Sequence, residues 1–265
     1  MNSPESEHPL ALATALTQKT RALSQGLESG TADLLELVTP TTAELLAWWF
    51  GEDMVAARGG TGGGLNFHAG QKQAILNAIV AHEVLGAGQV RWGLLDLYKA
   101  AAPDALLTGS RLAEVSADKH GHPKYCFKMA TGTGKTWVLQ ALMIWQLLNK
   151  TAAQAAGLDD SRFTRHFMVV APGLIVYERL LDAFCGKLTE GGNGARDFVS
   201  SDIAQFAELF IPEAYRELVF AFVRGNVCSK NDIGLKATGN GMIAITNWHL
   251  LAEGDEVAEE VEALE

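Results

Sequence analysis

The sequence predicts an α/β fold built around a parallel sheet. Three observations support this: the 265-residue chain is 48% apolar, strand-like and helix-like segments alternate after residue 124, and a glycine-rich turn joins one such strand to one such helix. This alternation is typical of parallel sheets whose strands are connected through helices. The apolar content excludes intrinsic disorder, and the length allows one large domain or two small ones.

The N-terminal part has the spacing of helices over residues 8–50. Thr41-x-x-Glu44 has the spacing of a capping box, which predicts a helix over 43–50 that ends at Gly51. The glycine-rich run 58–64 follows, and it indicates a linker because no Lys-Ser/Thr pair comes after it and no apolar run precedes it. We therefore expect a helical region at 1–58, a linker at 59–64 and a second domain at 65–265.

The later elements follow from the spacing of apolar residues. Helical spacing predicts helices over 70–85, 94–101, 135–149, 174–184, 201–210 and 212–223, with a further amphipathic helix in the acidic tail. Short apolar runs predict strands over 125–129, 167–171 and 242–246. Between the second and third of these helices, residues 103–123 are expected to be mostly loop.

The charge distribution leaves nucleic acid open as a partner. The net charge is −10, but residues 253–265 carry seven acids and no base, and the rest of the chain has 24 acidic and 21 basic residues. A nearly neutral body can present a local basic groove. The three cysteines have no metal or redox spacing, and the chain carries neither a secretory signal nor a long apolar run, so we expect a cytoplasmic protein without membrane contact.

The strongest functional signal is the segment Met129-Ala-Thr-Gly-Thr-Gly-Lys-Thr136 between a predicted strand and a predicted helix. Gly132 and Gly134 allow the backbone to turn its N–H groups toward a phosphate, and the N-terminus of the helix adds partial positive charge. Lys135 can reach the β- and γ-phosphates, and the Thr136 hydroxyl can bind Mg²⁺. The general motif has glycine where this chain has Met129. The segment nevertheless predicts binding of a nucleotide phosphate.

This variant of the motif, which lacks the first glycine and reads Ala130-Thr-Gly-Thr-Gly-Lys-Thr136, resembles motif I of superfamily 2 DEAD/DEAH-box-type helicases. It is most similar to the restriction-enzyme branch, and in particular to the type III restriction enzyme Res subunit family. The resemblance covers residues 65–251 and implies an incomplete RecA-like P-loop NTPase domain after the helical region. It also implies the N-terminal portion of an ATP-dependent DNA helicase or translocase, with ATP and Mg²⁺ as cofactors. DNA would be one partner, and a modification (methyltransferase) subunit is a second candidate.

The resemblance also assigns the nucleotide site. Residues 67–75 resemble the helix whose glutamine reads the adenine edge, which implies that Gln71 is the base reader. The loop would then bind the nucleotide through Gly132, Thr133, Gly134, Lys135 and Thr136, with Lys135 and Thr136 taking part in catalysis and Thr136 binding the metal. Without the resemblance, Gln71 would be an ordinary surface glutamine of an amphipathic helix.

Two further segments resemble parts of the family that face DNA. Residues 167–174 are similar to motif Ia, which implies DNA contact at Pro172 and Gly173, although this pair also suits a simple strand end. Residues 245–251 look like a later strand end of the family, which implies contact at Thr246 and Asn247. Capping of the following helix is the alternative for these two residues.

Hydrolysis in this family needs a strand that ends in Asp-Glu-x-His. The one Asp-Glu pair, Asp255-Glu256, lies in the acidic tail, so we expect a motor domain truncated before that motif, which binds nucleotide weakly and hydrolyses it poorly. The pair His120 and His122 indicates a loop rather than a metal site, because no Cys or carboxylate cluster accompanies it. Another P-loop ATPase, a kinase, or a truncated non-catalytic nucleotide-binding or interaction protein stays open as an alternative.

Overall fold

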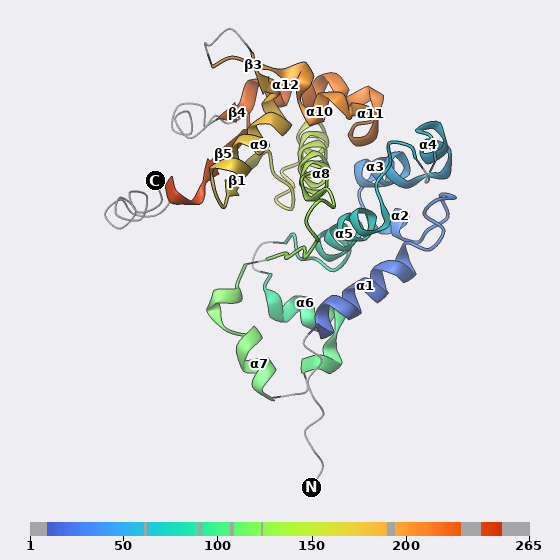
Figure 1. Cartoon of the computed structure of the whole chain (residues 1–265). Helices are drawn as coiled ribbons and strands as arrows, with labels where there is room; N and C mark the ends of the chain where they lie inside the picture. Colours follow the sequence, from blue (N-terminus) through green and yellow to red (C-terminus); the bar gives the residue numbers. More distant parts are fainter. Residues whose placement is uncertain are drawn as a thin grey trace. The chain divides into compact units, whose positions relative to one another are not determined.

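The computed structural model divides the chain into two compact units, Met1–Phe163 and Thr164–Glu265. Each unit is described by itself below. This division does not coincide with the expected domains at 1–58, 59–64 and 65–265, which stay predictions. The structure describes residues 10–60, 63–89, 92–106, 109–122, 124–189, 194–228 and 240–250 (Figure 1).

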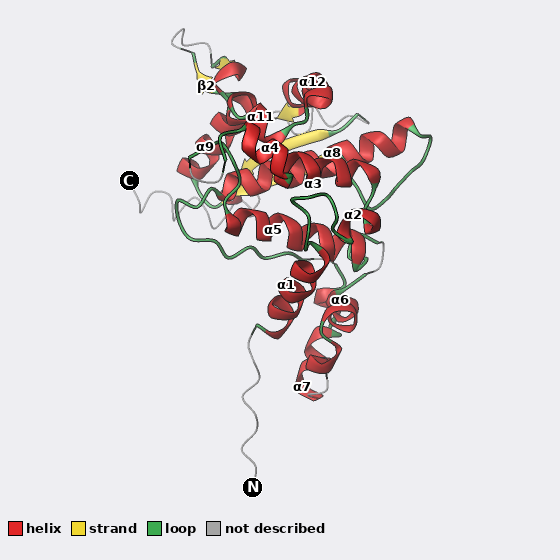
Figure 2. Cartoon of the chain, turned by 90° about the vertical axis from the view of Figure 1, so that its right-hand side faces the viewer, coloured by secondary structure: helices red, strands yellow, loops and turns green. Residues whose placement is uncertain are grey.

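The first unit is built from helices and loops in its described residues (Figure 2). Its α-helices are α1 (Ala11–Leu23), α2 (Leu34–Leu37), α3 (Pro40–Phe50), α4 (Glu52–Ala57), α5 (Ala69–Ile79), α6 (Leu94–Ala101), α7 (Gly109–Val115) and α8 (Lys135–Ala155). A π-helical turn, η1 (Val80–Val84), continues α5, and two 3₁₀ turns are η2 (Pro103–Leu106) and η3 (Asp118–His120). No described helix is both long enough and apolar enough to cross a bilayer.

Helix α8 forms the core of the first unit, and α3 and α5 pack against it. Its apolar residues recur at helical spacing, so that Val138, Ala141, Ile144, Leu147 and Leu148 lie on one buried side. The facing helices contribute fully buried side chains: Leu45, Leu46 and Trp49 from α3, and Ile75 and Ile79 from α5. Helix α8, whose first residue is Lys135, is therefore held by apolar packing from Val138 to Leu148.

A buried polar network joins α3, η1 and α8. The Glu83 carboxylate accepts hydrogen bonds from Thr42 Oγ1 at 2.6 Å, from Trp145 Nε1 at 2.8 Å and from the Thr39 amide at 2.9 Å. Asn149 Nδ2 donates to Thr42 Oγ1 at 2.9 Å, and Thr39 Oγ1 donates to Asn149 Oδ1. Because a buried carboxylate is costly without partners, this network specifies how the three elements pack.

The second unit contains the predicted parallel sheet. Its strands β1 (His166–Ala171), β5 (Met242–Asn247) and β4 (Val227–Cys228) lie side by side in that order, and both pairs are parallel. The helices α9 (Leu174–Cys185) and α12 (Arg216–Asn226) pack against the sheet (Figure 1). The fold class is thus confirmed as α/β with a helix-flanked parallel sheet.

Shorter elements complete the second unit. The antiparallel pair β2 (Lys187–Leu188) and β3 (Arg196–Asp197) is fastened to α9 by Arg196, which pairs with Glu178 and Asp182 at 2.6 Å each. The remaining elements are η4 (Phe198–Ser200), α10 (Asp202–Gln205), α11 (Ala207–Phe210), η5 (Glu213–Tyr215) and η6 (Trp248–Leu250).

The structure corrects several sequence-based expectations. Residues 125–129 pair with no described strand. The cap of α3 is Thr39 rather than Thr41, because Pro40 occupies the first turn and Thr39 Oγ1 accepts the Thr42 amide at 3.2 Å. Helix α7 lies in the expected loop 103–123, and the expected helix 201–210 is two short helices. The acidic tail lies outside the described residues.

Candidate phosphate-binding site

The backbone of the predicted phosphate loop has the conformation that its glycines allow. Gly132 has φ +79° and Gly134 has φ +68°, both in the left-handed region that other residues rarely adopt. Gly134 is the N-cap of α8, so Lys135 is the first residue of a 21-residue helix. A loop of this kind ahead of a helix N-terminus directs N–H groups and partial positive charge toward an anion.

Lys135 lies across the loop that precedes it. Its ammonium group donates to the Met129 carbonyl at 3.1 Å and to the Ala130 carbonyl at 2.8 Å. Thr133 tightens the same turn, because its hydroxyl donates to the Ala130 carbonyl at 2.7 Å. An ammonium group carries three donors, so a phosphate oxygen can accept the third.

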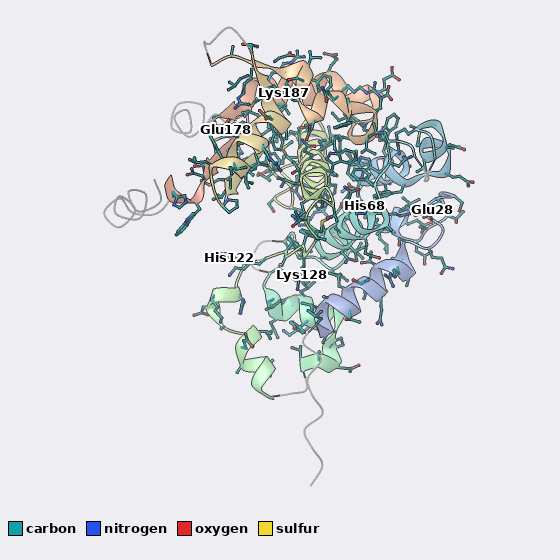
Figure 3. All side chains as sticks on the ribbon, in the orientation of Figure 1. Glu28, His68, His122, Lys128, Glu178 and Lys187 are labelled. Atoms are coloured by element: carbon teal, nitrogen blue, oxygen red, sulfur yellow. The ribbon has the colours of Figure 1, made fainter. Side chains whose placement is uncertain are left out.

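The start of α5 contacts the phosphate loop through two side chains. Gln71 Nε2 donates to the Gly134 carbonyl at 3.3 Å, and His68 Nε2 lies 2.9 Å from the Thr133 carbonyl. Gln71 is buried, with 3% of its surface exposed, whereas His68, labelled in Figure 3, is exposed. The structure therefore brings Gln71, the predicted base reader, to the loop. It also brings His68 to the loop, a contact that the sequence did not predict.

The fit of the site to Mg²⁺ rests on one described side chain. Thr136 is half-buried in the first turn of α8, beside the loop. No cluster of three His, Cys, Asp or Glu side chains suited to a metal occurs in the described residues, which include His120 and His122. Mg²⁺ commonly keeps several waters and takes phosphate oxygens as ligands, so one hydroxyl fits a nucleotide-borne ion rather than an ion held by protein alone.

The residues expected to face DNA meet at one edge of the sheet in the second unit. Strands β1 and β5 are parallel, and Ala171 lies opposite Asn247 in their register. Pro172 and Gly173 follow β1 directly, so they leave the sheet at the same edge at which Thr246 and Asn247 end β5. Pro172 is exposed, but Thr246 and Asn247 are buried, with 1% and 5% of their surfaces exposed.

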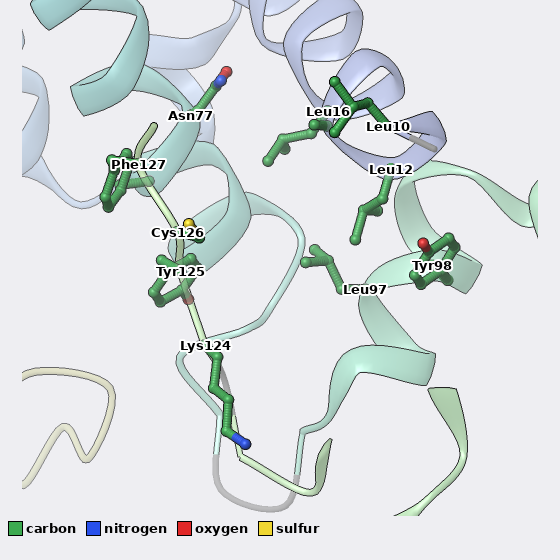
Figure 4. Close-up of a pocket in the computed structure, with 12 residues that line it drawn as sticks. Leu10, Leu12, Leu16, Asn77, Leu97, Tyr98, Lys124, Tyr125, Cys126 and Phe127 are labelled. Atoms are coloured by element: carbon green, nitrogen blue, oxygen red, sulfur yellow. The ribbon is translucent and has the colours of Figure 1, made fainter. Parts of the chain in front are cut away.

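One cavity in the first unit lies apart from the predicted site residues (Figure 4). Its volume is about 310 Å³, and its walls come from α1, α5, α6 and the extended segment 124–127. Most of the lining is apolar, including Leu12 and Leu16 from α1 and Leu97 from α6. None of the residues predicted to bind nucleotide lines this cavity.

The sequence was compared with known families, with curated proteins and with solved structures. The sequence matches the family of the type III restriction enzyme, res subunit, over residues 65–230, which is more than half of the chain. A search of curated proteins and a search of solved structures each found no match. The match begins just before α5 and includes the phosphate loop, β1 and α9. It implies a RecA-like fold and a helicase-like P-loop ATPase family. The chain belongs to the type III restriction enzyme Res subunit family.

Proposed function

We propose that the chain binds ATP with Mg²⁺ through the loop 132–136 and forms the N-terminal portion of an ATP-dependent DNA helicase or translocase of the restriction-enzyme type. The observation that carries this proposal is the pair of left-handed glycines, Gly132 and Gly134, directly ahead of Lys135 at the N-terminus of α8. Membership of the Res family supports the same function.

The loop residues have distinct tasks in this proposal. The amides that follow Gly132 and Gly134 donate to phosphate oxygens, and Lys135 neutralises the charge of the β- and γ-phosphates. The Thr136 hydroxyl would help to hold Mg²⁺, and the ion would supply positive charge to the phosphates. Lys135 is held beside the loop by its contacts with the Met129 and Ala130 carbonyls, which supports this assignment.

Gln71 is proposed to read the adenine base. Its amide is already engaged at both ends: Oε1 accepts the His68 amide at 3.0 Å, and Nε2 donates to the Gly134 carbonyl at 3.3 Å. Base reading would therefore share or exchange one of these bonds. If Gln71 reads adenine, Gln71→Ala lowers affinity for ATP more than for GTP. An equal loss for both nucleotides would restrict Gln71 to supporting the loop.

DNA binding is proposed for the edge at which β1 and β5 end. The backbone groups of Pro172 and Gly173 can contact DNA there. Thr246 and Asn247 are buried, so they are suited to holding the ends of the strands in place. A modification subunit is the second proposed partner. Contacts with phosphates predict that single-stranded DNA affinity falls as salt rises. A flat salt response would contradict DNA contact at this edge.

The proposal is tested by titrating a fluorescent ATP analogue with Mg²⁺ into the wild type, Lys135→Ala and Lys128→Ala. Lys128 is a matched control, because it is an exposed lysine seven residues before Lys135 (Figure 3). Loss of a charge-assisted contact predicts a roughly ten- to hundredfold weaker affinity for Lys135→Ala and little change for Lys128→Ala. Equal affinity in all three proteins would contradict the phosphate assignment.

A further inference from the structure

Two consecutive carbonyls of the phosphate loop are held by side chains from the start of α5. His68 Nε2 lies 2.9 Å from the Thr133 oxygen, and Gln71 Nε2 lies 3.3 Å from the Gly134 oxygen. Gln71 belongs to the nucleotide site expected from the sequence, but His68 does not. The contact of His68 with the loop therefore needs its own explanation.

The hydrogen bonds of His68 determine its tautomer. Its Nδ1 accepts the amide of Gly70 at 3.1 Å and the amide of Gln71 at 3.3 Å, which makes His68 the N-cap of α5. A ring nitrogen that accepts these bonds carries no proton, so the proton of the neutral ring is on Nε2. Nε2 therefore donates to the Thr133 carbonyl. The same ring caps one helix and holds the loop that starts another.

The packing of the preceding residue and a backbone hydrogen bond fix the position of His68. The preceding residue, Phe67, packs its ring against those of Trp49 and Phe50, with centroids 6.1 and 5.9 Å away. Trp49 and Phe50 end α3 and are buried. In addition, the His68 amide donates to Gln71 Oε1 at 3.0 Å, which closes a capping box. The packing of Phe67 and the capping box therefore hold the backbone of His68 in place.

Fixing these carbonyls also orients the amides that face a phosphate. A trans peptide is planar, and its N–H points away from its C=O. The Thr133 carbonyl shares a peptide with the Gly134 amide, and the Gly134 carbonyl shares one with the Lys135 amide. A donor on the α5 side of each carbonyl therefore turns both amides away from α5. Gly132 and Gly134 give the loop backbone conformational freedom, and the hydrogen bond from His68 limits that freedom.

We propose that His68 is a positioning residue that presets the phosphate loop for the phosphate chain of the nucleotide, an inference that rests on the proposed ATP binding at 132–136. His68 acts through the Thr133 carbonyl and does not itself touch the nucleotide. Preorganised donors bind an anion more tightly because they lose less freedom on binding. Loss of the His68 contact should weaken binding of the phosphate chain whatever base is attached.

The test separates the two tasks of His68. In His68→Asn, the shorter side chain is still a good N-cap for α5, but it cannot reach the Thr133 carbonyl; His68→Ala loses both functions. The protein is titrated with a fluorescent ATP analogue and Mg²⁺, and bound analogue is displaced with inorganic tripolyphosphate. We expect His68→Asn to keep the melting temperature of the wild type. It should bind both ligands about two- to tenfold more weakly, the range of one net hydrogen bond.

Lys135→Ala in the same series distinguishes this inference from the proposed function. If Lys135→Ala binds as tightly as the wild type, the proposed nucleotide site itself is wrong. If Lys135→Ala binds weakly while His68→Asn binds like the wild type, only the role of His68 is overturned. A His68→Asn protein whose affinity loss merely follows a lowered melting temperature also overturns that role, because the effect would then be structural. Weaker binding at an unchanged melting temperature supports it.

Discussion

At the residue scale, the two glycines of the phosphate loop have similar dihedrals but different surroundings. A Cβ atom at Gly132 would meet nothing within 4 Å, whereas one at Gly134 would conflict sterically with Gln71 Nε2. The left-handed conformation costs a non-glycine residue about 1–2 kcal/mol at either position. Only at Gly134 is this strain combined with displacement of a side chain that supports the loop.

Gly134→Ala should therefore be more harmful than Gly132→Ala. We expect Gly132→Ala to lower the free energy of unfolding by about 1–2 kcal/mol, from backbone strain alone. Gly134→Ala should lower it further and weaken the hold of Gln71 on the loop. Urea unfolding of both variants measures the difference. Equal destabilisation would show that the contact of Gln71 with Gly134 does not constrain the loop.

His82 is a second residue whose surroundings predict a measurable effect. Burial lowers the pKa of His82 below its ordinary value, against the opposing effect of the Arg162 carbonyl, to which Nε2 donates at 2.7 Å. Trp145 and Phe163 pack around its ring. The unfolded chain therefore binds a proton more readily than the folded protein at this residue. This contribution to stability is present above the ordinary histidine pKa and is lost as the pH falls through the lowered one.

The stability of the protein should thus fall between about pH 7.5 and about pH 5.5, in part because of His82. His82→Gln keeps a donor for the Arg162 carbonyl but does not titrate in this range. We expect a smaller decrease in the urea midpoint across these pH values for His82→Gln than for the wild type. Identical pH dependence in the two proteins would mean that His82 is not buried in its neutral form.

The residues that could be predicted without a family resemblance are those whose chemistry depends on their neighbours in the sequence. Gly132, Gly134 and Lys135 lie within four consecutive residues, so their spacing predicts the loop. His68 could not be found in this way, because its contact with Thr133 spans 65 positions and depends on how α5 packs. Thr246 and Asn247 end a predicted strand, as expected, but their burial depends on the surrounding fold and could not be predicted from the sequence.

At the element scale, α8 connects the phosphate loop to the N-terminal helices. Its N-terminus forms the loop, and its middle donates Trp145 Nε1 to Glu83 at 2.8 Å and to Thr42 at 2.9 Å. Asn149, one turn later, donates to Thr42 as well. Packing of α3 and η1 on α8 thus depends on a few buried polar contacts in addition to apolar burial.

Trp145→Phe should reveal the strength of this connection. The change removes the indole donor and leaves the buried Glu83 carboxylate with one partner fewer, which is expected to lower the free energy of unfolding by about 1–3 kcal/mol. Trp248→Phe is the control, because Trp248 is 54% exposed. Urea unfolding monitored by circular dichroism compares the two. A loss for Trp145→Phe no larger than that for Trp248→Phe would contradict a stabilising role for the network.

The elements that the sequence predicts best are those with a long or complete pattern. The apolar spacing of α8 extends from Val138 to Leu148 and predicted most of the 21-residue helix, and the continuous apolar runs of β1 and β5 predicted two strands that pair in parallel. Strand β5 is buried, whereas β1 exposes Met168 and Val170. The prediction failed for residues 125–129, because an apolar run indicates strand propensity but not a partner for pairing. It also failed for the cap at Thr41, because Pro40 starts the helix earlier.

At the scale of the whole molecule, the proposed nucleotide and DNA contacts belong to different compact units. His68, Gln71 and the loop 132–136 lie in Met1–Phe163, whereas the edge where β1 and β5 end lies in Thr164–Glu265. The family match over 65–230 includes residues of both units. Nucleotide binding should therefore be detectable within the first unit whether or not DNA is present.

Hydrogen exchange measured by mass spectrometry on the full chain, with and without ATP and Mg²⁺, tests the central claim most directly, because it locates the bound nucleotide. We expect slower exchange in peptides that cover 129–137 and 68–71, and clearly less protection in Lys135→Ala at the same ATP concentration. Peptides of β1 and β5 should change little without DNA. Protection that is confined to other segments, or that persists unchanged in Lys135→Ala, would contradict nucleotide binding at the phosphate loop.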